Sequence, residues 1–254
     1  MSSVISKFWS SEEAVEYYNC VRNTPNSVII LSRDEYESVA KAKELIFASP
    51  FAYSYFTQAK TYEELRHQVP IYFTYKGHDF KALLDGIKID HKHNIIQPFD
   101  LKTTSKDVYK FHESYLRYGY YRQAALYEQA LLSKESPIKN LLAEGYELKD
   151  FIFIVVETRL SSVNPAIIYR TSKTERKAGL KGGKVNGEVF KGIDQLLEDY
   201  LWHQETDHWV YPREVFQNGG EISLNNFFLL NIHHPCNGLI KLREYSMILI
   251  CLYL

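Results

Sequence analysis

Charged residues stand inside apolar, strand-like segments between residues 80 and 127, and this feature limits what the chain can form more than any other. Asp85 follows the apolar run 82–84, while Asp100 and Lys102 interrupt a second apolar run. An unpaired carboxylate in such a setting costs several kcal/mol to desolvate, or its pKa shifts until it is neutral. The fold must therefore place a balancing group beside each of these charges.

Three arrangements satisfy that requirement. In the first, Asp100 and Lys102 face solvent from an edge strand, and Asp85 belongs to a turn before Gly86. In the second, Lys102 is only the salt-bridge partner of one carboxylate. In the third, residues 100 and 102 point the same way because side chains alternate along a strand, and Asp85 joins them from a neighbouring strand. Two carboxylates so close favour an oxygen-bound Mg2+ or Mn2+, beside which Lys102 can orient a water.

The order of these residues resembles the PD-(D/E)xK nuclease superfamily, and within it the RecB and RecE type of phage and bacterial DNA exonucleases. The likeness covers roughly residues 66–170. The matching features are Asp85, the phrase Asp100-Leu101-Lys102-Thr103-Thr104, the aromatic segment 115–121, and the pair Gln123 and Tyr127 with its four-residue spacing.

The resemblance implies an α/β fold with a restriction-endonuclease-like core, in which a central mixed β-sheet is flanked by helices. It also implies a Mg2+- or Mn2+-dependent deoxyribonuclease. Asp85, Asp100 and the Leu101 carbonyl would hold the metal, and Lys102 would position a water for attack on the phosphodiester. Gln123 and Tyr127, on one face of a helix, would brace the site or the nucleic acid.

The same resemblance suggests a biological setting, namely an exonuclease that acts on duplex DNA in phage or bacterial recombination and repair. Related exonucleases often form rings and work beside a single-strand-annealing protein, so a homo-oligomer and such a partner are expected. Two alternatives stay open. One is a defence or restriction-like endonuclease, and the other is a non-catalytic nucleic-acid-binding module derived from a nuclease.

Related nucleases usually supply one more acid or histidine upstream of the first catalytic aspartate. The candidates here are Glu64, His67 and Gln68, although His67 and Gln68 also fit the end of a surface helix. Asp90 is a rival for the role of Asp85, because the alternation of the strand continues as far as Asp90.

Charge is almost balanced, with 30 basic and 31 acidic residues, so no overall positive field indicates nucleic-acid binding. Contact with DNA must then come from local patches. A helix is predicted over 105–132 and a Gly-rich basic loop over 170–184, the latter equally compatible with an ordinary solvated loop. The phosphate contacts expected from these two segments are Lys106, Arg122, Lys173, Arg176 and Lys177.

The remaining features bound the domain organisation. The 3 cysteines are too few for a four-cysteine iron–sulfur cluster, and the start of the chain lacks the pattern of a signal peptide. The final apolar run, 247–254, is too short to cross a bilayer. We therefore expect a protein of the bacterial cytoplasm or a phage-infected cell, without a membrane partner. The predicted units are an N-terminal helical region over 1–65, the nuclease core over 66–222 and an apolar tail over 223–254.

Overall fold

The computed structural model of the chain describes residues 12–222, apart from 26–27 and 59. Its central sheet has the order β1-β2-β3-β5-β6, with β4 paired to β3, and these strands are β1 (Glu63–Tyr75), β2 (His78–Asp90), β3 (Ile95–Thr104), β4 (Glu147–Leu148), β5 (Ile152–Glu157) and β6 (Ile167–Arg170). β3 is parallel to β4 and β5, and the other neighbours are antiparallel. The sheet is therefore mixed, as predicted.

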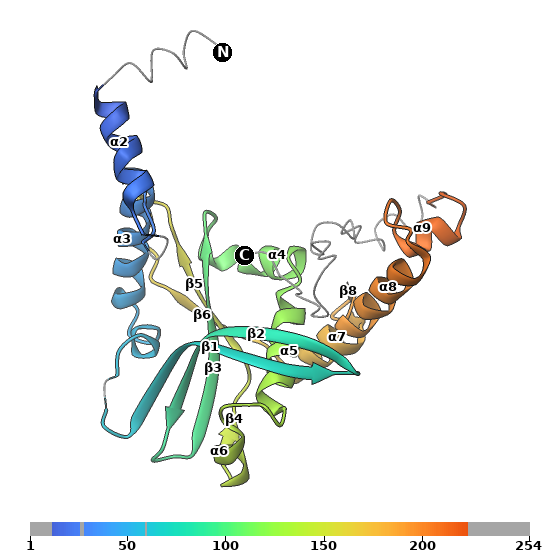
Figure 1. Ribbon diagram of the computed structural model, residues 1–254. Coiled ribbons are helices and arrows are strands. Elements are labelled where there is room, and N and C mark those ends of the chain that lie inside the picture. The colour runs from blue at the N-terminus through green and yellow to red at the C-terminus, as the bar shows by residue number, and fades with distance from the viewer. Residues whose placement is uncertain (1–11, 26–27, 59, 223–254) are drawn as a thin grey trace.

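Helices lie against both faces of this sheet (Figure 1), which confirms the predicted α/β class. α3 packs against β5 on one side, α5 lies across β1 and β2 on the other, and α7 packs on α5. The helices are α2 (Glu12–Asn23), α3 (Arg33–Ala48), α4 (Phe111–Arg117), α5 (Tyr120–Leu132), α6 (Lys139–Ala143), α7 (Lys173–Lys181), α8 (Ile193–Thr206) and α9 (Arg213–Gln217), with 3-10 turns η1 (Tyr53–Tyr55) and η2 (Val108–Lys110).

The sheet separates two apolar clusters. The larger, on the α5 side, includes Phe151 and Phe153, and the smaller, on the α3 side, includes Ile152 and Ile154. All of β5 is buried, and its residues alternate between the two clusters, as expected for a strand that is covered on both faces. β5 is thus a central strand of the sheet.

β2 and β3 separate beyond Gly86. They pair from Asp90 to Gly86, whereas residues 78–84 of β2 pair with β1 alone. A Cβ on Gly86 would lie 2.1 Å from the Phe99 ring, so the absence of a side chain permits this close crossing. At the same level of β1, Gln68 has a φ of 50°, which interrupts the regular ladder. The sheet consequently opens next to residues 85 and 101.

The single helix predicted over 105–132 is wrong. The segment forms η2, α4 and α5, and the chain turns between α4 and α5 at Gly119, whose φ is 67°. Such a left-handed conformation suits glycine and ends a helix. η2 has Asp107 as its N-cap, and the Asp107 carboxylate accepts from the Tyr109 N–H.

The basic segment 170–184 is largely helical, which corrects the predicted loop. α7 begins after Ser172, whose hydroxyl accepts from the Glu175 N–H while the Glu175 carboxylate accepts from the Ser172 N–H. A short hairpin of β7 (Gly183–Val185) and β8 (Glu188–Phe190) follows α7 and precedes α8, which begins at Ile193.

The predicted domain boundary after residue 65 lies within the described residues, and the predicted boundary after residue 222 lies at their end. The boundary predicted after residue 65 falls inside β1, so the N-terminal region is not wholly helical up to that point. The tail over 223–254 lies outside the described residues. Within the part of the chain that the structure describes, none of the helices has the length and apolar character needed to span a bilayer.

Candidate active site

Asp100 and Lys102 lie on one side of β3, in the centre of the sheet. Their side chains are each 3% exposed, and the Lys102 Nζ is 2.8 Å from the Asp100 Oδ2. β3 lies between β2 and β5, so the interpretation of both residues as solvent-facing groups of an edge strand is wrong. Alternation along the strand places the carboxylate and the ammonium together, on the face covered by α5.

Asp85 reaches this pair from β2 at the point where the strands separate. Its Oδ2 accepts the Leu101 N–H at 2.8 Å, and its Oδ1 accepts the Gln68 side-chain amide at 3.2 Å. The carboxylate thus replaces the backbone acceptor that a continued β2–β3 ladder would supply. Asp85 is partly exposed, so the group of Asp85, Asp100 and Lys102 meets solvent on the Asp85 side.

α5 holds both strands in place. The Gln123 amide donates to the Asp100 Oδ1 at 2.9 Å, and the Tyr127 hydroxyl donates to the Leu83 carbonyl of β2 at 2.9 Å. Burial raises the pKa of Tyr127 to about 12, so this hydroxyl stays protonated and remains a donor. The four-residue spacing of Gln123 and Tyr127 therefore serves one helix face, as predicted, and that face contacts β3 and β2.

The Asp100 carboxyl has a raised pKa. Burial raises the pKa of its carboxyl from 3.8 to about 6, the Lys102 ammonium opposes this shift, and the negative charge of Asp85 adds to it. The influence of Asp85 shows that the two carboxylates are close enough to interact. A carboxylate in this position is easily protonated, and any cation placed beside it would stabilise its charged form.

The residues present fit a hard cation. Among the described side chains, the buried Gln123 Oε1 has no hydrogen-bond partner, and the buried Asp100 Oδ2 and Lys102 Nζ meet in an ion pair at 2.8 Å. Two of these atoms are oxygens of the kind that Mg2+ and Mn2+ bind. The described residues contain no cluster of three His, Cys, Asp or Glu side chains, so the Leu101 or Gln123 carbonyl and waters would have to complete the coordination.

Tyr120 is a neighbour of the site that the sequence analysis did not single out. The Lys102 Nζ lies 4.5 Å from the centroid of the Tyr120 ring and 5.9 Å from that of Phe153. A cation over an aromatic face is stabilised by the ring quadrupole, more strongly when water is excluded. The spacing held a signal for this contact, since Tyr120 precedes Gln123 by three residues and so shares its helix face.

The other acids and histidines predicted near the site are placed differently. The His67 ring packs against Phe56 and Phe99 in the α3-side cluster, whereas Gln68 does contact Asp85. Asp90, the rival of Asp85, accepts the N–H groups of Lys92 and His93 within the β2–β3 turn, at 3.0 Å each. Asp90 thus caps a turn, and the structure does not place it with Asp100.

Glu64, the last upstream candidate, is engaged elsewhere. Its carboxylate contacts Arg66 at 2.6 Å and His91 at 3.2 Å. The hydrogen bond from the Arg66 guanidinium lowers the pKa of Glu64. Of the upstream candidates, only Gln68 therefore has a direct contact to the candidate site.

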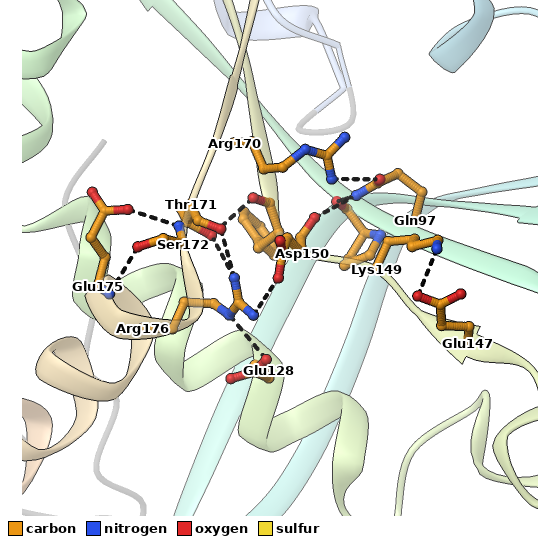
Figure 2. A network of polar contacts seen from close by, with 12 residues as sticks. Gln97, Glu128, Glu147, Lys149, Asp150, Arg170, Thr171, Ser172, Glu175 and Arg176 are labelled. Atoms are coloured by element: carbon orange, nitrogen blue, oxygen red, sulfur yellow. Dashed lines mark hydrogen bonds and ion pairs between the residues drawn. The ribbon is translucent and has the colours of Figure 1, made fainter.

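Two of the five predicted phosphate contacts are wrong, because their side chains are buried. Arg122 is 7% and Arg176 5% exposed. Arg122 donates to the Tyr121 hydroxyl at 2.7 Å, and Arg176 donates to Glu128, Asp150 and the Thr171 carbonyl (Figure 2). Both guanidinium groups therefore bind the protein itself.

The three remaining predicted contacts are exposed. Lys106 pairs with Glu113 at 2.9 Å, with both side chains nearly half exposed. Lys173 and Lys177 lie four residues apart on the exposed side of α7. All three lysines are exposed, unlike the two arginines, although Lys106 would have to exchange Glu113 for a phosphate.

No protein-family model matches the chain, and no curated protein does. A crystal structure from Eubacterium rectale, of a protein described provisionally as an exonuclease, is similar with a TM-score of 0.40 and 12% identity. The similarity spans 86% of this chain and 66%, just under two-thirds, of that one.

Proposed function

We propose that this protein is a divalent-metal-dependent DNA nuclease of the PD-(D/E)xK type. The observation that supports the proposal is the convergence of Asp85, Asp100 and Lys102 where β2 and β3 separate. Two carboxylates and an ammonium so arranged suit phosphodiester hydrolysis, in which negative charge must be stabilised and a water must be oriented.

In the proposed reaction each side chain has a separate task. A bound Mg2+ or Mn2+ would supply Lewis-acid activation of the phosphodiester, held by Asp85, Asp100 and the Leu101 carbonyl. Lys102, in its desolvated position against Tyr120, orients the attacking water and stabilises charge on the phosphate. Gln123 fixes the Asp100 carboxylate, and Tyr127 fixes the strand that carries Asp85.

The narrower assignments rest on the sequence resemblance. We infer an exonuclease of the RecB and RecE type that hydrolyses duplex DNA in phage or bacterial recombination and repair. A cytoplasmic setting, assembly of several copies and a single-strand-annealing partner belong to the same inference. The resemblance is supported by the phrase Asp100-Leu101-Lys102 on β3 and by the contacts of Gln123 and Tyr127 from α5.

The test is incubation of end-labelled linear duplex DNA with the protein, with Mg2+ or with a chelator. We expect cleavage only with the metal. Lys102→Ala should retain DNA binding and lose cleavage by at least about a hundredfold, the scale of a lost charge-stabilising group. Lys43→Ala, which removes an exposed lysine of α3, is the matched control and should cleave normally.

Unchanged cleavage by Lys102→Ala would exclude this site. Cleavage of covalently closed circular DNA distinguishes an endonuclease from an exonuclease, because an exonuclease needs a DNA end and an endonuclease does not. Metal-independent binding without cleavage by the wild-type protein would instead favour the non-catalytic binding module.

A further inference from the structure

A line of aromatic rings leads from the candidate active site to the protein surface. Tyr120 lies against Lys102, with 4.5 Å between the ammonium nitrogen and the ring centroid. The Tyr118 ring follows, with its centroid 5.7 Å from that of Tyr120 and a tilt of 37° between the planes. Tyr118 is 50% exposed, so the line ends in a ring that solvent reaches.

Two further aromatic rings pack against Tyr120. Phe111 stacks on Tyr120 with an interplanar angle of 16°, and the Phe153 ring lies 5.7 Å from Tyr120 on another side. Tyr118 is anchored by its own N–H, which donates to the Ser114 carbonyl at 2.9 Å. The left-handed Gly119 between the two tyrosines lets the chain turn there while their rings stay adjacent. The backbone that carries Tyr118 is thereby fixed next to Tyr120.

A positive charge accompanies the exposed ring. The Arg117 guanidinium carbon lies 5.8 Å from the centroid of the Tyr118 ring, and the Arg117 side chain is exposed. An exposed aromatic ring with a cation over it matches one nucleotide of a single strand, whose base stacks on the ring while its phosphate meets the cation. A base inside a duplex has both faces covered by its neighbours and offers no such face.

We propose that Tyr118 is a stacking site for an unpaired base of single-stranded DNA, next to the phosphodiester to be cleaved. The inference rests on the proposed nuclease function and deepens it, because it assigns the substrate class. The strand that enters the site would be unpaired at this point, as at a frayed or resected end, and Arg117 would contact its backbone.

The experiment measures binding in the presence of a chelator, so that cleavage plays no part. Fluorescence anisotropy of a labelled oligothymidylate and of a blunt duplex gives the affinity of each variant for both. Tyr118→Ala should weaken binding of the single strand about tenfold, and binding of the duplex much less. Tyr118→Trp should retain the single-strand affinity, because it keeps an aromatic face.

Tyr36→Ala is the matched control, since Tyr36 is 65% exposed and lies on α3, which covers the other face of the sheet. It should bind both ligands like the wild type. Wild-type affinity of Tyr118→Ala for the oligothymidylate would overturn the stacking site and leave the nuclease proposal intact. If the wild-type protein bound neither DNA, both proposals would be overturned. If the wild type bound DNA and Tyr118→Ala lost single-strand affinity, but the wild type showed no metal-dependent cleavage, only the nuclease proposal would be rejected.

Discussion

At the scale of single residues, Asp100 determines how the site responds to pH. The pKa of its carboxyl is about 6 in the folded protein, against an ordinary 3.8, chiefly because of burial. The folded state therefore binds this proton more tightly than the unfolded chain does. Its contribution to the free energy of unfolding is most favourable at low pH and declines as pH rises from about 4 through 6.

A comparison with Asp100→Asn isolates this contribution. In a chelating buffer, the free energy of unfolding of the wild type should fall relative to that of the variant by about 3 kcal/mol between roughly pH 4 and pH 7. Urea unfolding across this pH range provides the measurement. Parallel pH profiles would contradict the raised pKa.

The same pair of proteins tests the metal without any substrate. A cation that binds only the folded state raises the unfolding temperature by mass action. At neutral pH, Mg2+ should therefore raise the unfolding temperature of the wild type and have little effect on Asp100→Asn, and its removal by a chelator should reverse the change. An equal response of both proteins would place the cation elsewhere.

The residue scale also shows what the sequence could predict. Strand alternation was sufficient to place Asp100 with Lys102, and the preference for Asp85 over Asp90 agrees with their positions in the structure. Exposure was not predictable for Arg176, because a basic segment looks the same whether its arginine meets solvent or the interior. Only the folded chain brings its distant carboxylate partners within reach.

At the scale of elements, the junction between α4 and α5 sets the position of Tyr120 and Gln123. Gly119 has a φ of 67°, and a Cβ there would lie 2.1 Å from the Arg122 guanidinium. The sequence analysis predicted one continuous helix, because no proline interrupts it. A single glycine is a weak signal in sequence, although here it ends one helix and starts another.

Replacement of Gly119 by alanine should destabilise the protein more than the same change at Gly77. Gly77 also has a left-handed φ, 79°, but a Cβ there meets nothing within 4 Å. Gly77→Ala should then cost about 1–2 kcal/mol from backbone strain alone. Gly119→Ala should cost roughly 2 kcal/mol more, because the buried Arg122 must move. Chemical unfolding of both variants decides this, and equal losses would rule out the clash.

At the scale of the whole molecule, the outer helix α7 is attached through Arg176. This guanidinium contacts Glu128 of α5 at 2.9 Å and Asp150, just before β5, at 2.6 Å (Figure 2). It thereby joins the outer helix, the inner helix and the start of a central strand. Lys173 and Lys177 of the same helix remain exposed.

The two kinds of basic residue on α7 should respond differently to mutation. Arg176→Gln should lower the free energy of unfolding by about 2–3 kcal/mol, since it removes the hydrogen bonds of a buried guanidinium to two partly exposed carboxylates. The double variant Lys173→Gln and Lys177→Gln should keep wild-type stability and reduce the salt dependence of DNA binding by roughly two phosphate contacts. Thermal unfolding and salt titration of DNA binding measure these effects, and an unchanged salt slope would remove α7 from the DNA interface.

The long β1–β2 hairpin extends beyond the part of β2 that pairs with β3, and its outer half forms an arm that packs on α5 through buried residues such as Phe73 and Phe80. Two tyrosine hydroxyls bind this arm as well. Tyr127 holds the arm at the Leu83 carbonyl, and Tyr75 holds it at Asp194 of α8, each at 2.9 Å. Asp85 stands at the root of this arm, whereas Asp100 belongs to the fixed centre of the sheet. A change in the tilt of the hairpin would therefore change the distance between the two carboxylates.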